Sequence, residues 1–449
     1  MISLKQYFCT EEGVLVIYTV KNLTDIPMGS YGLIGCPVEH SVSPYIHALL
    51  EKDSSYVLIN IEPCELEAAV PVLKQRMSGF NVTIPHKESV VKYLDKSFYP
   101  AVNTVCVNDG KLIGYNTDIE GFIFSVKSQN IDFKNKDVLV CGAGGAAYAL
   151  ATSSKELGAN VYIQSRTFSK TQLLAEKLNV RALESDEDFY PQIILNTTPL
   201  GMWPKLSGCI GVNLDRAEFV FDAIYNPVSS ILLKKAKLSG IETMNGALML
   251  TAQAALARQH WKNIKIPSEV ILSAYQNLEK YINNKFPQTI VLTGFMGCGK
   301  TTTGKLLAES LKLNFNDLDN IIECGEGCKT AEIFKSGEYR FRQLEGEYLK
   351  KALDIRPQVL SLGGGTVCFE ENLKLLKQSP CITFYLKADF DILANRVGGD
   401  SSRPLFRDVC EAESLYNKRL PNYEVAADFI IDASKSPQEC VNDILNILI

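Results

Sequence analysis

Two glycine-rich turns, each between an expected strand and an expected helix, constrain what this chain can fold into. The stretch VLVCGAGGAAYA runs from Val138 to Ala149, and VLTGFMGCGKTTT runs from Val291 to Thr303. Turns of this kind occur where a strand of a parallel sheet feeds a helix whose first backbone N–H groups can receive an anion. The two turns follow different patterns, so they indicate two separate sites in one polypeptide.

Short β-branched runs alternate with longer segments of helical period on both sides of the second turn. YGLIG, DVLVCG and QIILNT are such runs in the first half, and TIVLTG, QVLSLGGG and CITFYLK are their counterparts in the second. This alternation is typical of parallel α/β architecture, and 449 residues fit two or three domains. The polar stretch NNKFPQ, residues 283–288, is the expected linker because it separates an expected helix from a new strand.

The composition argues against several classes of protein. The chain has 46 basic and 51 acidic residues, a net charge of -5 and no block of like charge, so we expect neither nucleic-acid binding nor a disordered tail. The first ten residues, MISLKQYFCT, lack the features of a signal peptide, and no apolar run approaches the roughly 18 residues of a membrane span. We therefore expect a cytoplasmic protein without membrane partners.

The thirteen cysteines are scattered along the chain rather than spaced as a disulfide framework, which is typical of reduced thiols. Cys324 and Cys328 could supply half of a metal site. No second pair and no nearby histidine completes such a site, so we favour free thiols at both positions.

The second turn fits the P-loop pattern G-x-x-x-x-G-K-[ST] from Gly294 to Thr301, with a strand before it and a helix after it. Backbone N–H groups of such a loop surround phosphates, Lys300 can reach the outer phosphates, and the Thr301 hydroxyl can bind Mg²⁺. A chance match would lack this strand-and-helix context. The residues expected to contact ATP here are Gly297, Cys298, Gly299, Lys300, Thr301 and Thr302.

The segment after the P-loop resembles shikimate kinases from Thr289 to Ile449. It contains, in the family's order, GFMGCGKTT, DLD, GEYRFRQLE, GGG, RPL and an RxxxY pattern. The resemblance implies that Asp317 supports Mg²⁺ together with Thr301, and that Asp319 lies against the acceptor hydroxyl. Phosphoryl transfer depends on positioning and charge neutralisation, which agrees with a site built from a lysine, arginines and Mg²⁺.

The same resemblance assigns the arginines. Two of them form the pair that binds the substrate carboxylate, because a guanidinium can bind a carboxylate through two hydrogen bonds, and Glu345 holds one of this pair. Arg403 corresponds to the lid arginine over the transferring phosphate, and Arg396 to the arginine beside adenine. A single arginine is more often a solvated surface charge, but six motifs in order favour the site. The implied substrate-binding residues are Asp319, Arg342, Gly364, Gly365 and Arg419.

The first turn opens a strand–helix–strand unit with the pattern G-x-G-x-x-A, which is typical of a Rossmann dinucleotide site. An acidic residue at the end of the second strand would favour NAD, whereas this chain has two cations, Arg166 and Lys170. Cations at this position favour the 2′-phosphate of NADP; ordinary charges at a strand end are the alternative. The predicted NADP-binding residues are Gly142, Ala143, Gly144, Gly145, Ala146, Ser165, Arg166, Thr167 and Lys170.

The chain around this turn resembles shikimate dehydrogenase over about residues 30–281. The matching motifs are YGLIGCPVEHSVSPYIH, GFNVTIPHK, AVNTV, GYNTDIEGF, NTTPLGM, YNPVSSILL and NGALMLTAQAALA. Ser165 departs from the family, in which asparagine usually opens the NRT triplet. His40, His47 and His86 lie within these motifs without metal spacing, and we interpret them as local hydrogen-bonding residues.

The dehydrogenase resemblance implies a catalytic pair, Lys87 and Asp118. A ketone that receives hydride develops negative charge on oxygen, which an ammonium can stabilise and protonate while a carboxylate keeps the ammonium oriented. The remaining implied residues bind the substrate carboxylate or its hydroxyls. They are Ser41, Ser43 and Tyr225 for the carboxylate, and Thr83, Asn103 and Gln253 for the hydroxyls.

Taken together, these features predict a bifunctional enzyme that reduces 3-dehydroshikimate to shikimate with NADPH and then phosphorylates shikimate with ATP and Mg²⁺. The predicted fold is an N-terminal α/β substrate lobe at 30–130, a Rossmann lobe at 131–282 and a P-loop kinase at 289–449 with a three-layer arrangement; residues 1–29 are unassigned. Two alternatives stay open: a metabolite-sensing regulator built from enzyme-like domains, and a catabolic quinate/shikimate dehydrogenase that uses NAD.

Overall fold

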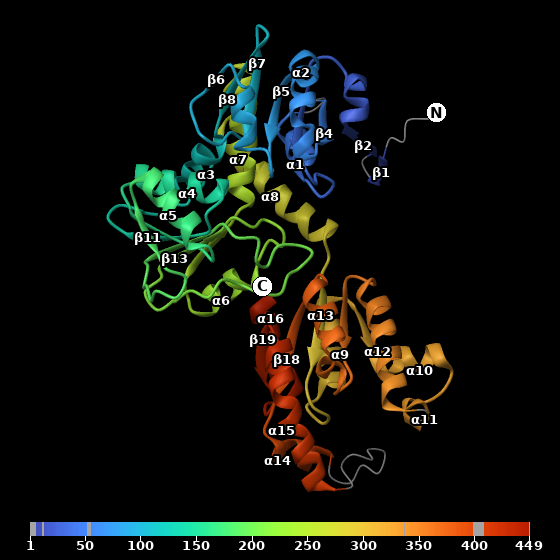
Figure 1. Cartoon of the computed structure of the whole chain (residues 1–449). Coiled ribbons are helices and arrows are strands. Elements are labelled where there is room, and N and C mark those ends of the chain that lie inside the picture. Colours follow the sequence, from blue (N-terminus) through green and yellow to red (C-terminus); the bar gives the residue numbers. More distant parts are fainter. Residues whose placement is uncertain (1–5, 11–12, 52–54, 336, 398–407, 449) are drawn as a thin grey trace. The chain divides into compact units, whose positions relative to one another are not determined.

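The computed structural model describes residues 6–10, 13–51, 55–335, 337–397 and 408–448, and the chain divides into two compact units (Figure 1). The first unit comprises residues 1–198, 211–228 and 241–282. The second comprises residues 199–210, 229–240, where α6 (Ile231–Leu238) lies, and 283–449. Each unit is described separately below.

The first unit begins with an eight-stranded mixed sheet in the order β1-β2-β4-β3-β5-β7-β8-β6. Its β3, β4 and β5 are parallel, and β5, β7 and β8 are antiparallel neighbours. The N-terminal segment adds β1 and β2 at one edge, where β2 pairs with β4 in parallel. The strands are Gln6–Thr10, Gly13–Thr19, Ser30–Gly35, Tyr56–Asn60, Met77–Val82, Lys96–Ser97, Thr104–Asn108 and Lys111–Tyr115 for β1 to β8.

The second sheet of this unit is six-stranded and parallel throughout, in the order β11-β10-β9-β12-β13-β14. The central strands are apolar and buried on both faces, as expected for a sheet covered by helices on both sides. The strands are Asp137–Cys141, Asn160–Gln164, Arg181–Leu183, Ile193–Asn196, Phe219–Asp222 and Glu242–Asn245 for β9 to β14, and the helices between them include Gly145–Glu156 (α4) and Phe168–Leu178 (α5).

Helices from distant parts of the sequence complete the first unit. They are α1 (Ser43–Leu50), α2 (Leu66–Arg76), α3 (Thr117–Ser128), α7 (Ala247–Lys262) and α8 (Ser268–Lys285). α3 and α7 pack at very short range because Gly121 has no side chain: a Cβ there would lie 3.0 Å from the backbone nitrogen of Gln253. This close contact places α3, which carries Asp118, against the part of α7 that carries Gln253. α8 extends to Lys285, three residues into the expected linker, since no helix breaker precedes Pro287.

The second unit contains a five-stranded parallel sheet in the order β16-β17-β15-β18-β19. Its strands are Thr289–Thr293, Asn314–Asp317, Gln358–Ser361, Cys381–Lys387 and Phe429–Asp432 for β15 to β19. Its helices are Lys300–Leu311, Leu318–Glu326, Thr330–Lys335, Glu338–Leu353, Glu370–Gln378, Phe390–Val397, Val409–Ala426 and Pro437–Leu448 for α9 to α16 (Figure 1). The sheets and their helices confirm the predicted α/β fold class.

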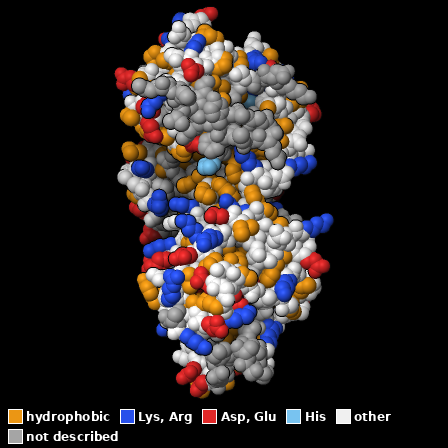
Figure 2. All heavy atoms as spheres, turned by 90° about the vertical axis from the view of Figure 1, so that its right-hand side faces the viewer, with side chains coloured by type: hydrophobic (Ala, Val, Ile, Leu, Met, Phe, Trp, Pro, Cys, Tyr) orange, Lys and Arg blue, Asp and Glu red, His pale blue; other side chains and the backbone are white. Residues whose placement is uncertain are grey.

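The surface carries charges of both signs. On the face drawn in Figure 2, basic and acidic side chains are interspersed among polar and apolar ones, in keeping with a net charge of only -5. Within the described ranges, no helix combines the length and apolar character needed to cross a bilayer. All twelve cysteines whose side chains the structure describes are free thiols, Cys324 and Cys328 included.

Gly246, at the start of α7, packs against the backbone of Ala223, which follows β13 of the second sheet. A Cβ at this position would lie 2.2 Å from the carbonyl oxygen of Ala223, a backbone atom that cannot move independently. We expect Gly246→Ala to destabilise the first unit by about 1–3 kcal/mol, as overpacking does. Gly211→Ala is the matched control, because a Cβ there meets no atom within 4 Å. Equal urea midpoints for the unfolding of the first unit in both variants would contradict this account.

Candidate functional sites

The first candidate site centres on an ion pair between Lys87 and Asp118. Lys87 Nζ donates a hydrogen bond to Asp118 Oδ2 at 2.6 Å, and both side chains are mostly buried. Asp118 lies in the first turn of α3, whose N-cap residue Asn116 accepts from the Asp118 backbone N–H and donates its amide to the carbonyl of Ala101. The N-terminus of a helix stabilises a carboxylate. Asn116, itself anchored to Ala101, therefore fixes the start of the helix that carries Asp118.

A buried cluster of polar side chains lies next to this pair. Asn103 Oδ1 accepts from the backbone N–H of Thr117 at 2.8 Å, and Asn103 Nδ2 donates to Gln253 Oε1 at 3.4 Å. Thr117 also donates its hydroxyl to Gln253 Oε1 at 3.3 Å. The structure thus brings together Asn103 directly before β7, Thr117 on α3 and Gln253 on α7. Two of these three were predicted to bind substrate hydroxyls.

The residues predicted to bind the substrate carboxylate lie at the start of α1 and in the segment after β13. Ser41 Oγ donates to Ser43 Oγ at 3.1 Å and accepts from the Ser43 backbone N–H at the start of α1. Thr83, which was predicted to bind a substrate hydroxyl, follows β5, and its methyl group packs against Gly35, where a Cβ would lie 2.4 Å away. Tyr225 follows β13, and burial raises the pKa of its hydroxyl. The two serines form one contiguous group.

The first glycine turn lies beside the Lys87–Asp118 pair. A Cβ on Gly145, the first residue of α4, would lie 3.5 Å from Cδ of Lys87. Gly142 has φ 126, and a Cβ there would collide with Thr197 Oγ1 at 2.2 Å. A Cβ on Gly144, in contrast, would meet no atom within 4 Å. The open side of Gly144 at a helix N-terminus is where a dinucleotide's phosphates would fit.

The end of β10 carries the residues predicted to select NADP. Ser165 Oγ shares a 2.7 Å hydrogen bond with Thr171 Oγ1 and so fixes the turn into α5. Arg166, Thr167 and Lys170 are exposed around this turn. Two exposed cations after β10, Arg166 and Lys170, fit the 2′-phosphate on the ribose of NADP.

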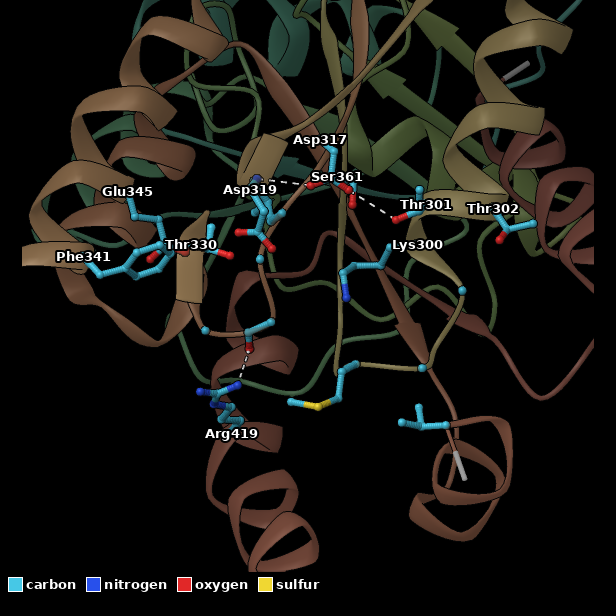
Figure 3. A pocket seen from close by; sticks show the side chains of 18 of the residues that line it. Lys300, Thr301, Thr302, Asp317, Asp319, Thr330, Phe341, Glu345, Ser361 and Arg419 are labelled. Carbon is cyan, nitrogen blue, oxygen red and sulfur yellow. Dashed lines mark hydrogen bonds between the residues drawn. The ribbon is translucent and has the colours of Figure 1, made fainter. Parts of the chain in front are cut away.

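The second candidate site is a cavity of about 540 Å³ at the carboxyl end of the five-stranded sheet (Figure 3). The P-loop curls around Lys300, whose ammonium donates to the carbonyls of Gly294 at 2.8 Å and Phe295 at 3.2 Å. Thr301 Oγ1 donates to Asp317 Oδ2 at 3.2 Å, and Asp317 also caps α10 through the Asp319 backbone N–H. The cavity is lined by all the predicted P-loop contacts except Cys298, which is buried beneath the loop.

The two predicted carboxylate arginines line this cavity. Arg342 on α12 is ion-paired with the fully buried Glu345 at 2.8 Å, and Thr366 donates to the other oxygen of Glu345 at 2.6 Å. Arg419 on α15 donates to the carbonyl of Gly364 at 3.1 Å. A Cβ on Gly365 would lie 2.4 Å from the Arg342 guanidinium, so a side chain there would displace this guanidinium. The GGG segment thus connects the two arginines.

Asp319 occupies the wall between the P-loop and these arginines. Burial, together with the nearby carboxylates of Asp317 and Glu345, raises the pKa of Asp319 to about 6. A carboxylate with this pKa ionises just below neutral pH and can accept a proton under physiological conditions.

Of the two remaining predicted arginines, only Arg396 lies within the described residues. Arg396 lines the same cavity and donates to the carbonyls of Ala433 at 2.7 Å and Ser434 at 3.0 Å, so it is anchored to the loop between β19 and α16. Arg403 lies outside the described residues, and its predicted lid role stays a prediction.

Comparison with known proteins follows this division of the chain. The family model for the shikimate dehydrogenase substrate binding domain matches residues 33–108, and the shikimate kinase model matches residues 296–449. An NADP(+) shikimate dehydrogenase of Nitrosopumilus maritimus is 37% identical over 267 residues, which cover 55% of this chain and 97% of the relative. This chain belongs to the shikimate dehydrogenase family. Its C-terminal part is a shikimate kinase domain.

Further shikimate dehydrogenases show the same coverage. The enzyme of Caldanaerobacter subterraneus is 40% identical over 253 residues, 51% of this chain and 90% of the relative. The crystal structure of the Thermus thermophilus enzyme with NADP(H) and shikimate has a TM-score of 0.52 at 29% identity, covering 56% of this chain and 99% of that one. A chorismate mutase/shikimate 5-dehydrogenase fusion from Clostridium acetobutylicum has a TM-score of 0.53 at 32% identity, covering 57% and 99%.

These matches confirm the expected pairing of a shikimate dehydrogenase with a shikimate kinase, and with it the two nucleotides, NADP and ATP. Mg²⁺ stays a prediction. Thr301 and Asp317 fit it, since their hydrogen-bonded oxygens face the P-loop cavity and Mg²⁺ binds one or two protein oxygens together with phosphates and water. The described residues contain no separate cluster of three metal ligands.

Sequence analysis missed several residues that the shikimate dehydrogenase and kinase sites contain. Thr117 contacts both Asn103 and Gln253, and it directly precedes the predicted Asp118, so its position in GYNTDIEGF was an available signal. Other missed residues line the kinase cavity and include one aromatic side chain next to Arg342. They are Met296, Thr330, Phe341, Ser361, Leu362, Gly363 and Val397. Met296, Phe341 and Gly363 lie inside the quoted motifs GFMGCGKTT, GEYRFRQLE and GGG, which were an available signal. The other four lie outside the six kinase motifs and reach the cavity only through the packing of separate elements.

The raised pKa of Asp319 predicts a pH profile for the kinase. As pH falls through about 6, Asp319 gains a proton and can no longer accept one, so kcat should fall. Protonation of ATP occurs in the same range, so the profile is compared with that of Asp319→Asn, which shares the ATP effect and lacks the carboxylate. The wild-type kcat divided by the Asp319→Asn kcat should decrease towards acid pH. A constant ratio down to pH 5 would remove Asp319 as the proton acceptor.

Proposed function

We propose that this chain is a bifunctional enzyme that converts 3-dehydroshikimate to shikimate with NADPH and shikimate to shikimate 3-phosphate with ATP. One observation carries the proposal. A single chain of the shikimate dehydrogenase family continues into a shikimate kinase domain, so the product of the first reaction is the substrate of the second. Each site also has its own group for a carboxylate, two serines in one and two arginines in the other.

In the dehydrogenase site, bound NADPH supplies the hydride that adds to the ketone carbon. Lys87 is oriented by the 2.6 Å contact with Asp118 and donates a proton to the oxygen that gains negative charge. Ser41 and Ser43 hold the substrate carboxylate with Tyr225, and Thr83, Asn103 and Gln253 hold its hydroxyls. The contact between Lys87 and Gly145 supports a ketone held beside the cofactor turn.

In the kinase site, bound ATP supplies the transferable phosphoryl group. The P-loop N–H groups and Lys300 neutralise phosphate charge, Thr301 and Asp317 would hold Mg²⁺, and Asp319 accepts the proton of the substrate hydroxyl. Arg342 and Arg419 bind the substrate carboxylate, and Arg342 is held in position by the buried Glu345. Arg396 would lie beside adenine, and Arg403 would close over the phosphates.

The two alternatives make different demands on these residues. A metabolite sensor would not need Lys87 and Asp319 to react, whereas an NAD-dependent quinate enzyme would not need Arg166 and Lys170. Exposed cations at the end of β10 and the close Lys87–Asp118 pair support the biosynthetic reading. We also propose a cytoplasmic location and small-molecule partners, without nucleic acid or membrane.

A pair of reciprocal variants tests the assignment of the two activities. Lys87→Ala should lower dehydrogenase kcat by on the order of 10²-fold or more, because a general acid is lost, and should leave shikimate phosphorylation unchanged. Asp319→Asn should do the reverse. Both activities are measured on the purified full chain, by NADPH oxidation and by ADP release. Lack of either activity in the wild-type chain, or loss of both in one variant, would overturn the proposal.

Cofactor choice is tested at Arg166 and Lys170. Replacing both with Ala should raise the KM for NADPH on the order of tenfold or more and change the KM for NADH little, because only NADPH carries the 2′-phosphate. Lys177→Ala is the matched control, since Lys177 is an exposed cation in the last turn of the same helix, α5. An unchanged NADPH/NADH preference in the double variant would place the selecting residues elsewhere.

A further inference from the structure

The phenol of Tyr56 is hydrogen-bonded to a side chain that holds the predicted hydroxyl-binding cluster. Tyr56 on β4 is buried, and its hydroxyl donates to Asn81 Oδ1 at 2.8 Å. The phenol proton is thus used within the protein.

Asn81 carries this contact onward to the predicted hydroxyl-binding cluster. Its Nδ2 donates to the carbonyl of Asn103 at 3.1 Å and to Thr104 Oγ1 at 3.0 Å. Thr104 in turn donates to Asn103 Oδ1 at 3.2 Å. Because the Tyr56 hydroxyl occupies Asn81 Oδ1, the amide of Asn81 can point its donors only towards Asn103 and Thr104.

The ring of Tyr56 is itself fixed from the other side. His47 stacks on it with ring centroids 3.9 Å apart, and His47 Nδ1 accepts from Arg258 Nε at 2.9 Å. The Arg258 side chain is fully buried and ion-paired with Glu51. A stack backed by a buried ion pair restricts the ring to the position from which its hydroxyl reaches Asn81.

We propose that Tyr56 is a positioning residue for the dehydrogenase substrate: through Asn81 it holds Asn103, one of the residues predicted to bind the substrate hydroxyls. This inference rests on the proposed function for the identity of the substrate. Tyr56 touches no reacting atom and acts through Asn81. The aromatic stack of His47 and the ion pair of Arg258 support the same placement.

The test removes only the hydroxyl. Tyr56→Phe should raise the KM for 3-dehydroshikimate and the Kd for shikimate by about tenfold, the effect of displacing binding groups that otherwise stay in place. The Kd is measured by calorimetry in an Arg419→Ala background, which weakens the second shikimate site in the kinase domain. The KM for NADPH should stay within about twofold of wild type, since the cofactor turn is not in contact with this network. A role confined to folding would lower the yield of active enzyme and leave KM and Kd unchanged.

The matched control is Tyr31→Phe. Tyr31 belongs to the same aromatic cluster, where it stacks on Trp261 with centroids 4.8 Å apart, and it takes no part in the contacts of Asn81 described above. This variant should keep the wild-type KM and Kd. An equal increase in both tyrosine variants would overturn the proposal.

A double-variant cycle provides a second measurement. If Tyr56 acts through Asn81, then Tyr56→Phe combined with Asn81→Ala should raise the Kd for shikimate no more than Asn81→Ala alone. Fully additive increases would overturn the proposal. The wild-type assay separates the proposed function from the role of Tyr56. A wild-type chain that neither binds shikimate nor reduces 3-dehydroshikimate refutes the proposed function. An active wild type with an unchanged Tyr56→Phe variant refutes only the role of Tyr56.

Discussion

Both sites of this protein depend on where a parallel strand delivers the helix that follows it. After β9 and again after β15, the chain turns through glycines and starts a helix whose first N–H groups point to the edge of the sheet. These N–H groups have no partner inside the helix and are available to phosphate oxygens. The nucleotide therefore sits at a fixed place in each unit, and the substrate groups must be arranged around it.

The two sites handle charge in opposite ways. In the dehydrogenase site a lysine and an aspartate are paired at 2.6 Å, which directs the ammonium. In the kinase site Asp319 is buried near two other carboxylates, and its pKa rises to about 6. The first arrangement suits a residue that must donate a proton, and the second suits a carboxylate that must accept one. These properties arise from neighbours rather than from the residue types.

Buried polar networks support both sites from behind. In the kinase domain Thr366 and Glu345 hold Arg342, and in the dehydrogenase Asn103 is held by Thr117, Thr104 and Asn81. Such side chains lie away from solvent, where a lost partner is costly, so each contact restricts the next one. This explains how loops and helices that are distant in sequence keep their functional groups in register.

The sequence by itself determined the fold class, the two nucleotide turns and the family resemblances, because these are encoded in contiguous motifs such as GAGGAA and GFMGCGKTT. It also placed Lys87 beside NVTIP and Asp118 in GYNTD, yet 31 residues separate them in the chain. Only the tertiary structure decided that they form an ion pair, that Gly145 lies beside Lys87 and that Tyr56 is hydrogen-bonded to Asn81. Local motifs follow from backbone geometry within a few residues, whereas these contacts follow from the packing of whole elements, as where Gly121 lets α3 approach α7.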